Sequence, residues 1–260
     1  MSMTLADKAR LFRSLHDQPR ALLMPNAWDM GSAKLLASLG YQALATSSGA
    51  AAAVLGRKDG QLTRDEALAH AQAIVQATEL PVSADLENGF GPEPSAAAET
   101  IRLAGQIGLA GGSIEDAVAG AKPYDFNHAV ERVAAAVEAA RTLPQPFTLT
   151  ARAENYLRGQ PDLDDTIRRL QAFERAGADV LFAPGLPDLG TVRTVCAALT
   201  QPLSFMVGIK GKSFSVAELE AAGVKRISFA TSFYRAAMKA ARDAAQEALE
   251  HGTFGYLDRL

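Results

Sequence analysis

The chain has 260 residues, of which 48% are hydrophobic and 21% charged, and its formal net charge is −3. These values are typical of a protein with a large apolar core, and they argue against a basic face for nucleic acid or for a membrane surface. No apolar run reaches the roughly 20 residues of a transmembrane helix. The N-terminal segment lacks the apolar core of a signal peptide, and the single cysteine, Cys196, excludes an intramolecular disulfide. We therefore expect a cytoplasmic protein.

Along the chain, helix-like segments alternate with short apolar runs that are typical of buried parallel strands. Glycine just after a helix supplies the left-handed residue that turns the chain back. Glycines in this position, each with the run that follows it, are Gly40 and 43–46, Gly108 and 112–115, Gly177 and 180–183, and Gly223 and 227–230. Four more apolar runs, without such a glycine, begin at Ala21, Pro81, Phe147 and Pro202.

The helix-like segments carry start signals of their own. Thr63 with Glu66, and Ser215 with Glu218, have the spacing of a capping box. Eight strand–helix units in 260 residues predict an α/β protein, a single (β/α)8 TIM barrel over residues 1–260 with an N-terminal helix. The alternative is a doubly wound open sheet, which usually has a glycine-rich nucleotide loop after its first strand. The sequence after the first predicted strand, MPNAWDMGS, does not fit such a loop.

Acidic residues gather where the predicted strands end. Asp85 and Glu87 close the third strand, and Glu115 closes the fourth. Residues two apart in a strand point to the same face, so we expect both acids at the barrel mouth, where TIM barrels hold their active sites. Unpaired buried acids are costly, and a set of oxygen donors without histidine or cysteine favours Mg²⁺ or Mn²⁺ over Zn²⁺. A solvated rim, or salt bridges with Arg152, is the alternative.

Arg152 follows the fifth predicted strand. Its guanidinium group has the geometry to bind a substrate carboxylate or phosphate with two hydrogen bonds. The alternative is a structural ion pair with Glu115 or Glu154.

Over nearly the whole chain, the sequence resembles the isocitrate lyase/phosphoenolpyruvate mutase superfamily. The motifs that carry the resemblance follow one another in the order of that superfamily and are NAWD, TSSG, RKDGQLTRDE, ADLENGFG, SIEDA and ARAEN. The resemblance implies a (β/α)8 barrel, with the last helix in many members swapped between subunits of a homodimer or homotetramer. It also implies that Mg²⁺ or Mn²⁺ holds a small 2-oxo or 2-hydroxy carboxylate substrate. From the charge balance we expect no nucleic acid and no membrane as a partner.

The resemblance also assigns roles to individual residues. Asp85 and Glu87 match the metal carboxylates, although Glu87 stands where aspartate is more common. Glu115 and Asp59 match acids that reach the metal mostly through water. Ser48 and the backbone of Gly49 match the site of the substrate carboxylate. Arg152 matches the arginine that clamps the substrate, and with the metal it would stabilise an enolate. Asp59, Glu154 and Tyr124 are the candidate general bases.

Several departures from the superfamily bear on the substrate. The lyases carry a Lys-Lys-Cys-Gly-His loop after the fourth strand, but residues 115–125 read EDAVAGAKPYD, without cysteine or histidine. Pro184 and Ser204 stand where these lyases have glutamate and asparagine, and the asparagine of the C–P branch has no clear counterpart. We predict a metal-dependent C–C bond lyase or decarboxylase that acts through a pyruvate-like enolate. The alternatives are a C–P bond mutase or hydrolase acting on phosphonopyruvate, and a barrel that binds an oxoacid without turnover.

Overall fold

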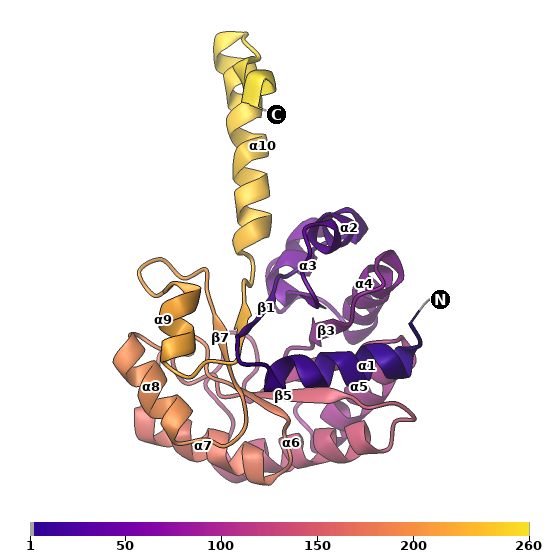
Figure 1. Ribbon diagram of the computed structural model, residues 1–260, viewed down its shortest axis with the longest axis vertical. Helices are drawn as coiled ribbons and strands as arrows, with labels where there is room; N and C mark the ends of the chain where they lie inside the picture. The colour runs from indigo at the N-terminus through magenta and orange to yellow at the C-terminus, as the bar shows by residue number, and fades with distance from the viewer. Residues whose placement is uncertain (1–2, 260) are drawn as a thin grey trace.

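In the computed structural model, which describes residues 3–259, eight parallel strands form one sheet in the order β1-β8-β7-β6-β5-β4-β3-β2 (Figure 1). The strands are β1 (Leu22–Met24), β2 (Leu44–Ala45), β3 (Val82–Asp85), β4 (Gly111–Glu115), β5 (Thr148–Arg152), β6 (Val180–Phe182), β7 (Leu203–Met206) and β8 (Arg226–Ser228). A parallel bridge between Asn26 and Ala45 joins the two edges of the sheet beyond β1 and β2. The predicted (β/α)8 TIM barrel is thus confirmed.

Helices follow the strands around the outside of the barrel. The helices are α1 (Leu5–Ser14), α2 (Met30–Ser38), α3 (Ser48–Val54), α4 (Arg64–Ala77), α5 (Pro94–Gln106), α6 (Phe126–Arg141), α7 (Leu163–Arg175), α8 (Leu189–Ala197), α9 (Val216–Ala221) and α10 (Ser232–His251), with short 3-10 helices η1 (Leu15–Asp17) and η2 (Gly255–Arg259). Both predicted capping boxes are present, at the starts of α4 and α9. The four glycines expected after helices all have positive φ, between 89° and 101°.

Two apolar clusters fill the space between the strands and the outer helices, and they contain the buried apolar side chains of α4 to α8. The N-terminal end of the barrel is closed by α1. Its Phe12 is fully buried, and a Cβ on Gly111 of β4 would lie 2.8 Å from the Phe12 ring. The barrel is therefore sealed below and open at the carboxyl ends of its strands.

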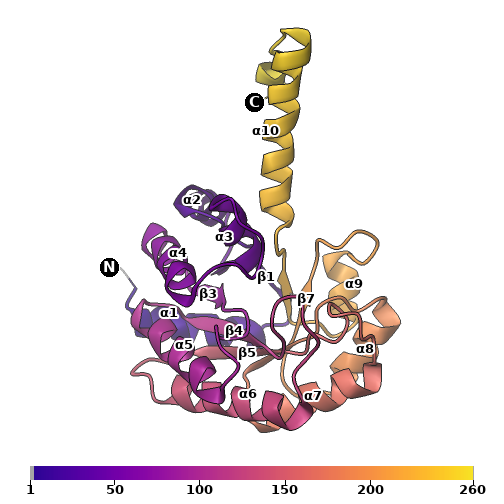
Figure 2. The ribbon, with the colours of Figure 1, turned by 180° about the vertical axis from the view of Figure 1, so that it is seen from behind.

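The last long helix, α10, has no place on the barrel wall. It extends away from the barrel as a separate rod (Figures 1 and 2), and none of its residues is buried. Apolar side chains on and just after it are exposed, among them Met238, Leu249 and Phe254. No helix within residues 3–259 is long and apolar enough to cross a membrane. The cytoplasmic location stays a prediction.

Candidate active site

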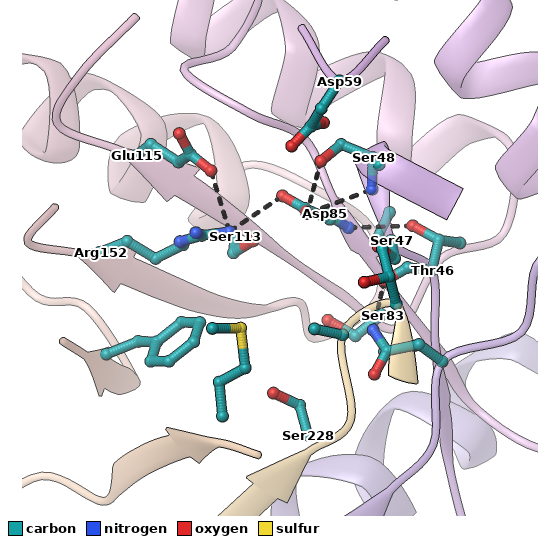
Figure 3. Close-up of a pocket in the computed structure, with 18 of the residues that line it drawn as sticks. Thr46, Ser47, Ser48, Asp59, Ser83, Asp85, Ser113, Glu115, Arg152 and Ser228 are labelled. Atoms are coloured by element: carbon teal, nitrogen blue, oxygen red, sulfur yellow. Dashed lines mark hydrogen bonds and ion pairs between the residues drawn. The ribbon is translucent and has the colours of Figure 1, made fainter. Parts of the chain in front are cut away.

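A cavity of about 260 Å³ opens at the carboxyl ends of the strands, where the sequence places the active site. Of the residues predicted for the site, those that line the cavity are Ser48, Gly49, Asp59, Asp85, Glu115 and Arg152. Figure 3 shows Asp85 between Ser48 and Arg152, and it shows Glu115 directed at the same end of the Arg152 guanidinium group. The barrel thus brings together residues that are up to 104 positions apart in the chain, from Ser48 to Arg152.

Arg152 lies at the centre of this group, with only 8% of its surface exposed. Its Nη1 is 3.1 Å from Oδ1 of Asp85 and 2.9 Å from Oε1 of Glu115, and its Nη2 is 2.8 Å from Oε1 of Glu154. Burial opposes its charge, but the three carboxylates outweigh burial and raise the pKa of Arg152. The structural ion pairs considered from the sequence are present. The role of substrate clamp stays a prediction.

A second arginine, Arg158, belongs to the same network and was not predicted. Its Nη2 donates to Oε2 of Glu115 at 2.9 Å and lies 3.4 Å from Oε2 of Glu154. The backbone N–H of Arg158 also bonds the carbonyl of Glu154, so one turn of chain carries Arg158 back over the strand end. The four-residue spacing from Glu154 was the available sequence signal.

Burial changes the protonation of the acids in this network. Desolvation raises the pKa of Glu115 to about 8, with Arg152 acting in the opposite direction. Desolvation also raises the pKa of Asp116 to about 6. Asp116 accepts hydrogen bonds from the Glu154 backbone and from Arg169, and so fixes the start of the segment that carries Glu154 and Arg158. The network therefore holds protons near neutral pH as well as charges.

The expectation that Asp85 and Glu87 share one strand face is wrong. Strand β3 ends at Asp85, and Glu87 has a φ of +48°, which is outside any strand conformation. Glu87 borders a separate groove beside Gly60 and Asn88, and it does not line the cavity that holds Asp85. Side chains two residues apart point to one face only where the chain is extended. Strand β3 ends at Asp85, two residues before Glu87, so this rule does not apply to Glu87.

The loop that carries Glu87 is held by a buried arginine from α6. Arg132 donates to the backbone carbonyls of Asn88, Gly91, Pro92 and Glu93. A cluster of carbonyls around one guanidinium group fixes the path of the loop, because each buried carbonyl needs a donor. Arg132 thus fixes the loop after Glu87, whereas Glu87 itself is held beside β4, because its carbonyl accepts a hydrogen bond from the Glu115 N–H at 2.8 Å.

The carboxylate oxygens at the mouth of the barrel are of the kind that binds a hard divalent cation. One oxygen of Glu87, Oε1, is buried without a hydrogen-bond partner among the described residues. Burial, followed by repulsion from Asp85 and Asp59, raises the pKa of Glu87 to about 7. Such repulsion between acids is what Mg²⁺ or Mn²⁺ would relieve. Within residues 3–259, however, no three acidic, histidine or cysteine side chains converge as a formed metal centre.

Ser48, Gly49 and Asp59 line the side of the cavity opposite Arg152. The backbone N–H and the hydroxyl of Ser48 donate to Oδ2 of Asp85, at 3.2 and 3.0 Å. A Cβ on Gly49 would lie 3.2 Å from the Thr231 methyl group and 3.4 Å from Cγ of Asp59, so glycine keeps this corner open. Asp59 is exposed and has no salt bridge with any residue that the structure describes.

Of the other candidate bases, Glu154 lines the cavity but is fully buried beneath the two arginines. Tyr124 lies outside the cavity lining, and its hydroxyl accepts a hydrogen bond from Asn88. Asp59 is therefore the candidate base with the freest access to the cavity.

Comparison with known families agrees with this arrangement. The profile of the phosphoenolpyruvate phosphomutase family matches residues 12–249. The chain belongs to the phosphoenolpyruvate mutase/isocitrate lyase superfamily. The resemblance drawn from the strand-end residues is thereby confirmed.

Relatives of this superfamily member include lyases. The chain is 30% identical to 2-methylisocitrate lyase of Escherichia coli (strain K12), over 96% of this chain and 88% of the relative. A candidate lyase/mutase of Burkholderia cenocepacia J2315 has a similar structure, with a TM-score of 0.96, 50% identity, and coverage of 98% of this chain and 92% of that chain. The structure of 2,3-dimethylmalate lyase gives a TM-score of 0.87 at 29% identity, covering 95% and 89%.

Proposed function

We propose that the protein is a Mg²⁺- or Mn²⁺-dependent C–C bond lyase or decarboxylase that acts on a small 2-oxo or 2-hydroxy dicarboxylate or tricarboxylate. The observation that carries this proposal is the cavity at the strand ends, in which Arg152 lies among the carboxylates of Asp85, Glu115 and Glu154. Support comes from the lyases among the similar proteins.

In the proposed site, Asp85 and Glu87 would hold the cation, with Glu115 and Asp59 contacting it through water. When bound, the cation would neutralise negative charge that develops on the substrate oxygen. Ser48 and the backbone of Gly49 would receive the substrate carboxylate. Because Ser48 donates to Asp85 in the structure, substrate or metal binding would release the serine for this contact.

The proposed reaction breaks a carbon–carbon bond at C3 of the substrate, C3–C4 in a 2-oxoacid that loses CO₂ and C2–C3 in a 2-hydroxy acid. In a decarboxylation the leaving fragment is CO₂, and the bonding electrons pass into the C2 carbonyl to form an enolate. In a retro-aldol cleavage of a 2-hydroxy acid, a base first takes the proton of the C2 hydroxyl, C2 becomes the carbonyl carbon of a departing 2-oxoacid, and the electrons of the C2–C3 bond pass from C3 into the carboxylate next to it to form an enolate. The enolate carbon then accepts a proton. Arg152 would stabilise the enolate through its fixed charge.

Asp59 is the proposed general base because it lines the cavity, is exposed and has no arginine partner. Glu154 is bound by two arginines, and its carboxylate is fully buried. The loop after β4 lacks the cysteine that isocitrate and methylisocitrate lyases use, which favours a substrate other than those two. Decarboxylation needs no such acid at the leaving group.

We also propose that the protein is a homodimer or homotetramer in which α10 packs on a neighbouring subunit. The helix is 20 residues long and buries none of them. A helix in a protein gains most of its stability when its apolar face packs against other parts of the structure. Gel filtration with light scattering tests the assembly, and a monomer of 27.4 kDa would contradict it.

Proton exchange tests the enolate chemistry without knowledge of the natural substrate. With Mg²⁺ in D₂O, the protein should exchange the methyl protons of pyruvate, as followed by proton NMR. Exchange should fall to the EDTA background on chelation and should be strongly reduced in Asp59→Asn. Metal-saturated protein that exchanges pyruvate no faster than EDTA-treated protein would count against the proposed intermediate.

A further inference from the structure

A third arginine faces the same cavity from below. Arg226 is the first residue of β8. It lines the cavity together with Ser228 on its own strand and Met24 on the neighbouring strand β1. Only 3% of its surface is exposed. It lies deeper than Arg152, since Arg226 begins its strand whereas Arg152 ends its strand. The deep end of the cavity thus carries a positive charge.

This charge lacks an acidic partner, unlike those of Arg152 and Arg158. Nε of Arg226 donates to the hydroxyl of Ser204 at 3.0 Å. Its Nη1 has no hydrogen-bond partner, and no salt bridge joins Arg226 to any acid within the described chain. Desolvation, followed by repulsion from Arg152, lowers the pKa of Arg226 to about 9, and no carboxylate counters this effect. A buried, unpaired guanidinium group is costly to keep.

The surroundings of Arg226 are polar rather than acidic. Ser83, Ser113 and Ser228 line the same cavity. Figure 3 shows Ser228 across the cavity from Asp59. An uncompensated arginine in a cavity that is also lined by hydroxyl groups forms a site that an anion would complete.

The two ends of the cavity differ in charge. At the mouth, the carboxylates of Asp59, Asp85, Glu115 and Glu154 outnumber the guanidinium groups of two arginines, Arg152 and Arg158. A second carboxylate on a substrate would be repelled there, whereas the deep end offers a cation without a partner. A small dicarboxylate fits this polarity when one carboxylate lies near Ser48 and the other points down the barrel.

We propose that Arg226 binds the second carboxylate of the substrate and so sets a preference for dicarboxylic over monocarboxylic acids. The proposal rests on the proposed function only for the place of the first carboxylate. It does not require turnover. Arg226, at the start of β8 and at the deep end of the cavity, would thus select the substrate.

Binding of two matched acids tests the proposal. Malate and 2-hydroxybutyrate differ by a terminal carboxylate in place of a methyl group, and their affinities can be measured by isothermal titration calorimetry with MgCl₂ present. The wild type should bind malate at least tenfold more tightly. Arg226→Met should reduce that preference to less than threefold, mainly by weakening malate binding. Met removes a desolvated charge at similar volume, so the thermal midpoint should not fall.

A matched control is provided by the adjacent cation. Lys225 bonds the backbone carbonyl of Gln18 outside the cavity, so Lys225→Met should keep the full preference for malate. Arg226→Gln, which can still donate to Ser204, gives the same comparison if the Met variant does not fold. A wild type without preference, or a preference kept in Arg226→Met or Arg226→Gln, would overturn the proposal. Failure of the wild type to turn over any acid would count against the proposed function and not against this comparison.

Discussion

Replacement of Arg152 by methionine should remove the cation that Asp85 shares with the buried Glu115 and Glu154, and should leave those two with Arg158 alone. In the structure its guanidinium nitrogens lie 2.8 to 3.1 Å from Asp85, Glu115 and Glu154. Breaking a buried ion pair by removing one partner typically costs about 3–5 kcal/mol of unfolding free energy. For a domain of this size that is a fall of roughly 6–20 °C in the thermal midpoint.

The loss should depend on pH with a definite sign. The pKa of Glu115 is raised to about 8 in the folded protein, from 4.5. Its contribution to stability is therefore complete below pH 4.5 and declines as the pH rises through 8. Arg152 offsets this decline, so Arg152→Met should cost more at pH 8 than at pH 5. Urea unfolding followed by circular dichroism at both pH values measures the difference.

A surface arginine supplies the control for this measurement. Arg168 pairs with Asp165 on the exposed side of α7, where a salt bridge is worth about 1 kcal/mol or less. Arg168→Met should therefore change stability little at either pH. The reasoning would be refuted if Arg152→Met cost less than about 1 kcal/mol at pH 8, or if it cost more at pH 5 than at pH 8.

Three further predictions concern metal binding by Asp85, the buried His16, and the loop of residues 88–93 that Arg132 holds. Asp85→Asn should weaken Mn²⁺ binding at least tenfold by calorimetry, while Glu131→Gln on the exposed face of α6 should not; equal affinities would exclude Asp85 as a ligand. Burial, followed by repulsion from Arg226, lowers the pKa of His16 from 6.5 to about 4, so the histidine destabilises the fold as the pH falls through that range. His16→Leu should remove about 2–3 kcal/mol of the stability lost between pH 7 and 4.5; identical acid profiles in urea unfolding would contradict this. Arg132→Met should speed hydrogen exchange in residues 88–93 and weaken Mn²⁺ binding, and unchanged exchange would show that other contacts hold the loop.

The sequence allowed the fold to be predicted because the barrel depends on local and repeated signals. Glycines after helices, capping boxes and short apolar runs each report a local conformation, and all eight strands were located within a few residues. The strand ends then follow from the fold, which is why Ser48, Asp85, Glu115 and Arg152 were expected at one mouth and line one cavity.

The features that were missed depend on the path of the chain after a strand or on burial. Glu87 was misplaced because β3 ends two residues before it, and the loop is set by Arg132 from a distant helix. Arg226 directly precedes the apolar run 227–230 that was predicted as the strand, and nothing in its sequence neighbours shows that it is buried without an acid. Arg158 carried a weak signal, its spacing from Glu154, in a segment without helical periodicity.

Product formation from oxaloacetate, methylisocitrate, dimethylmalate and phosphonopyruvate, with Mg²⁺ or Mn²⁺ and with EDTA, tests the central claim most directly. The account predicts that one of the C–C substrates is cleaved to a pyruvate-like or related enolate product, that EDTA abolishes the reaction, and that Arg152→Met does the same. Cleavage of phosphonopyruvate alone would assign C–P chemistry to this site. Oxoacid binding without turnover of any compound would contradict the account and identify the barrel as a binding protein.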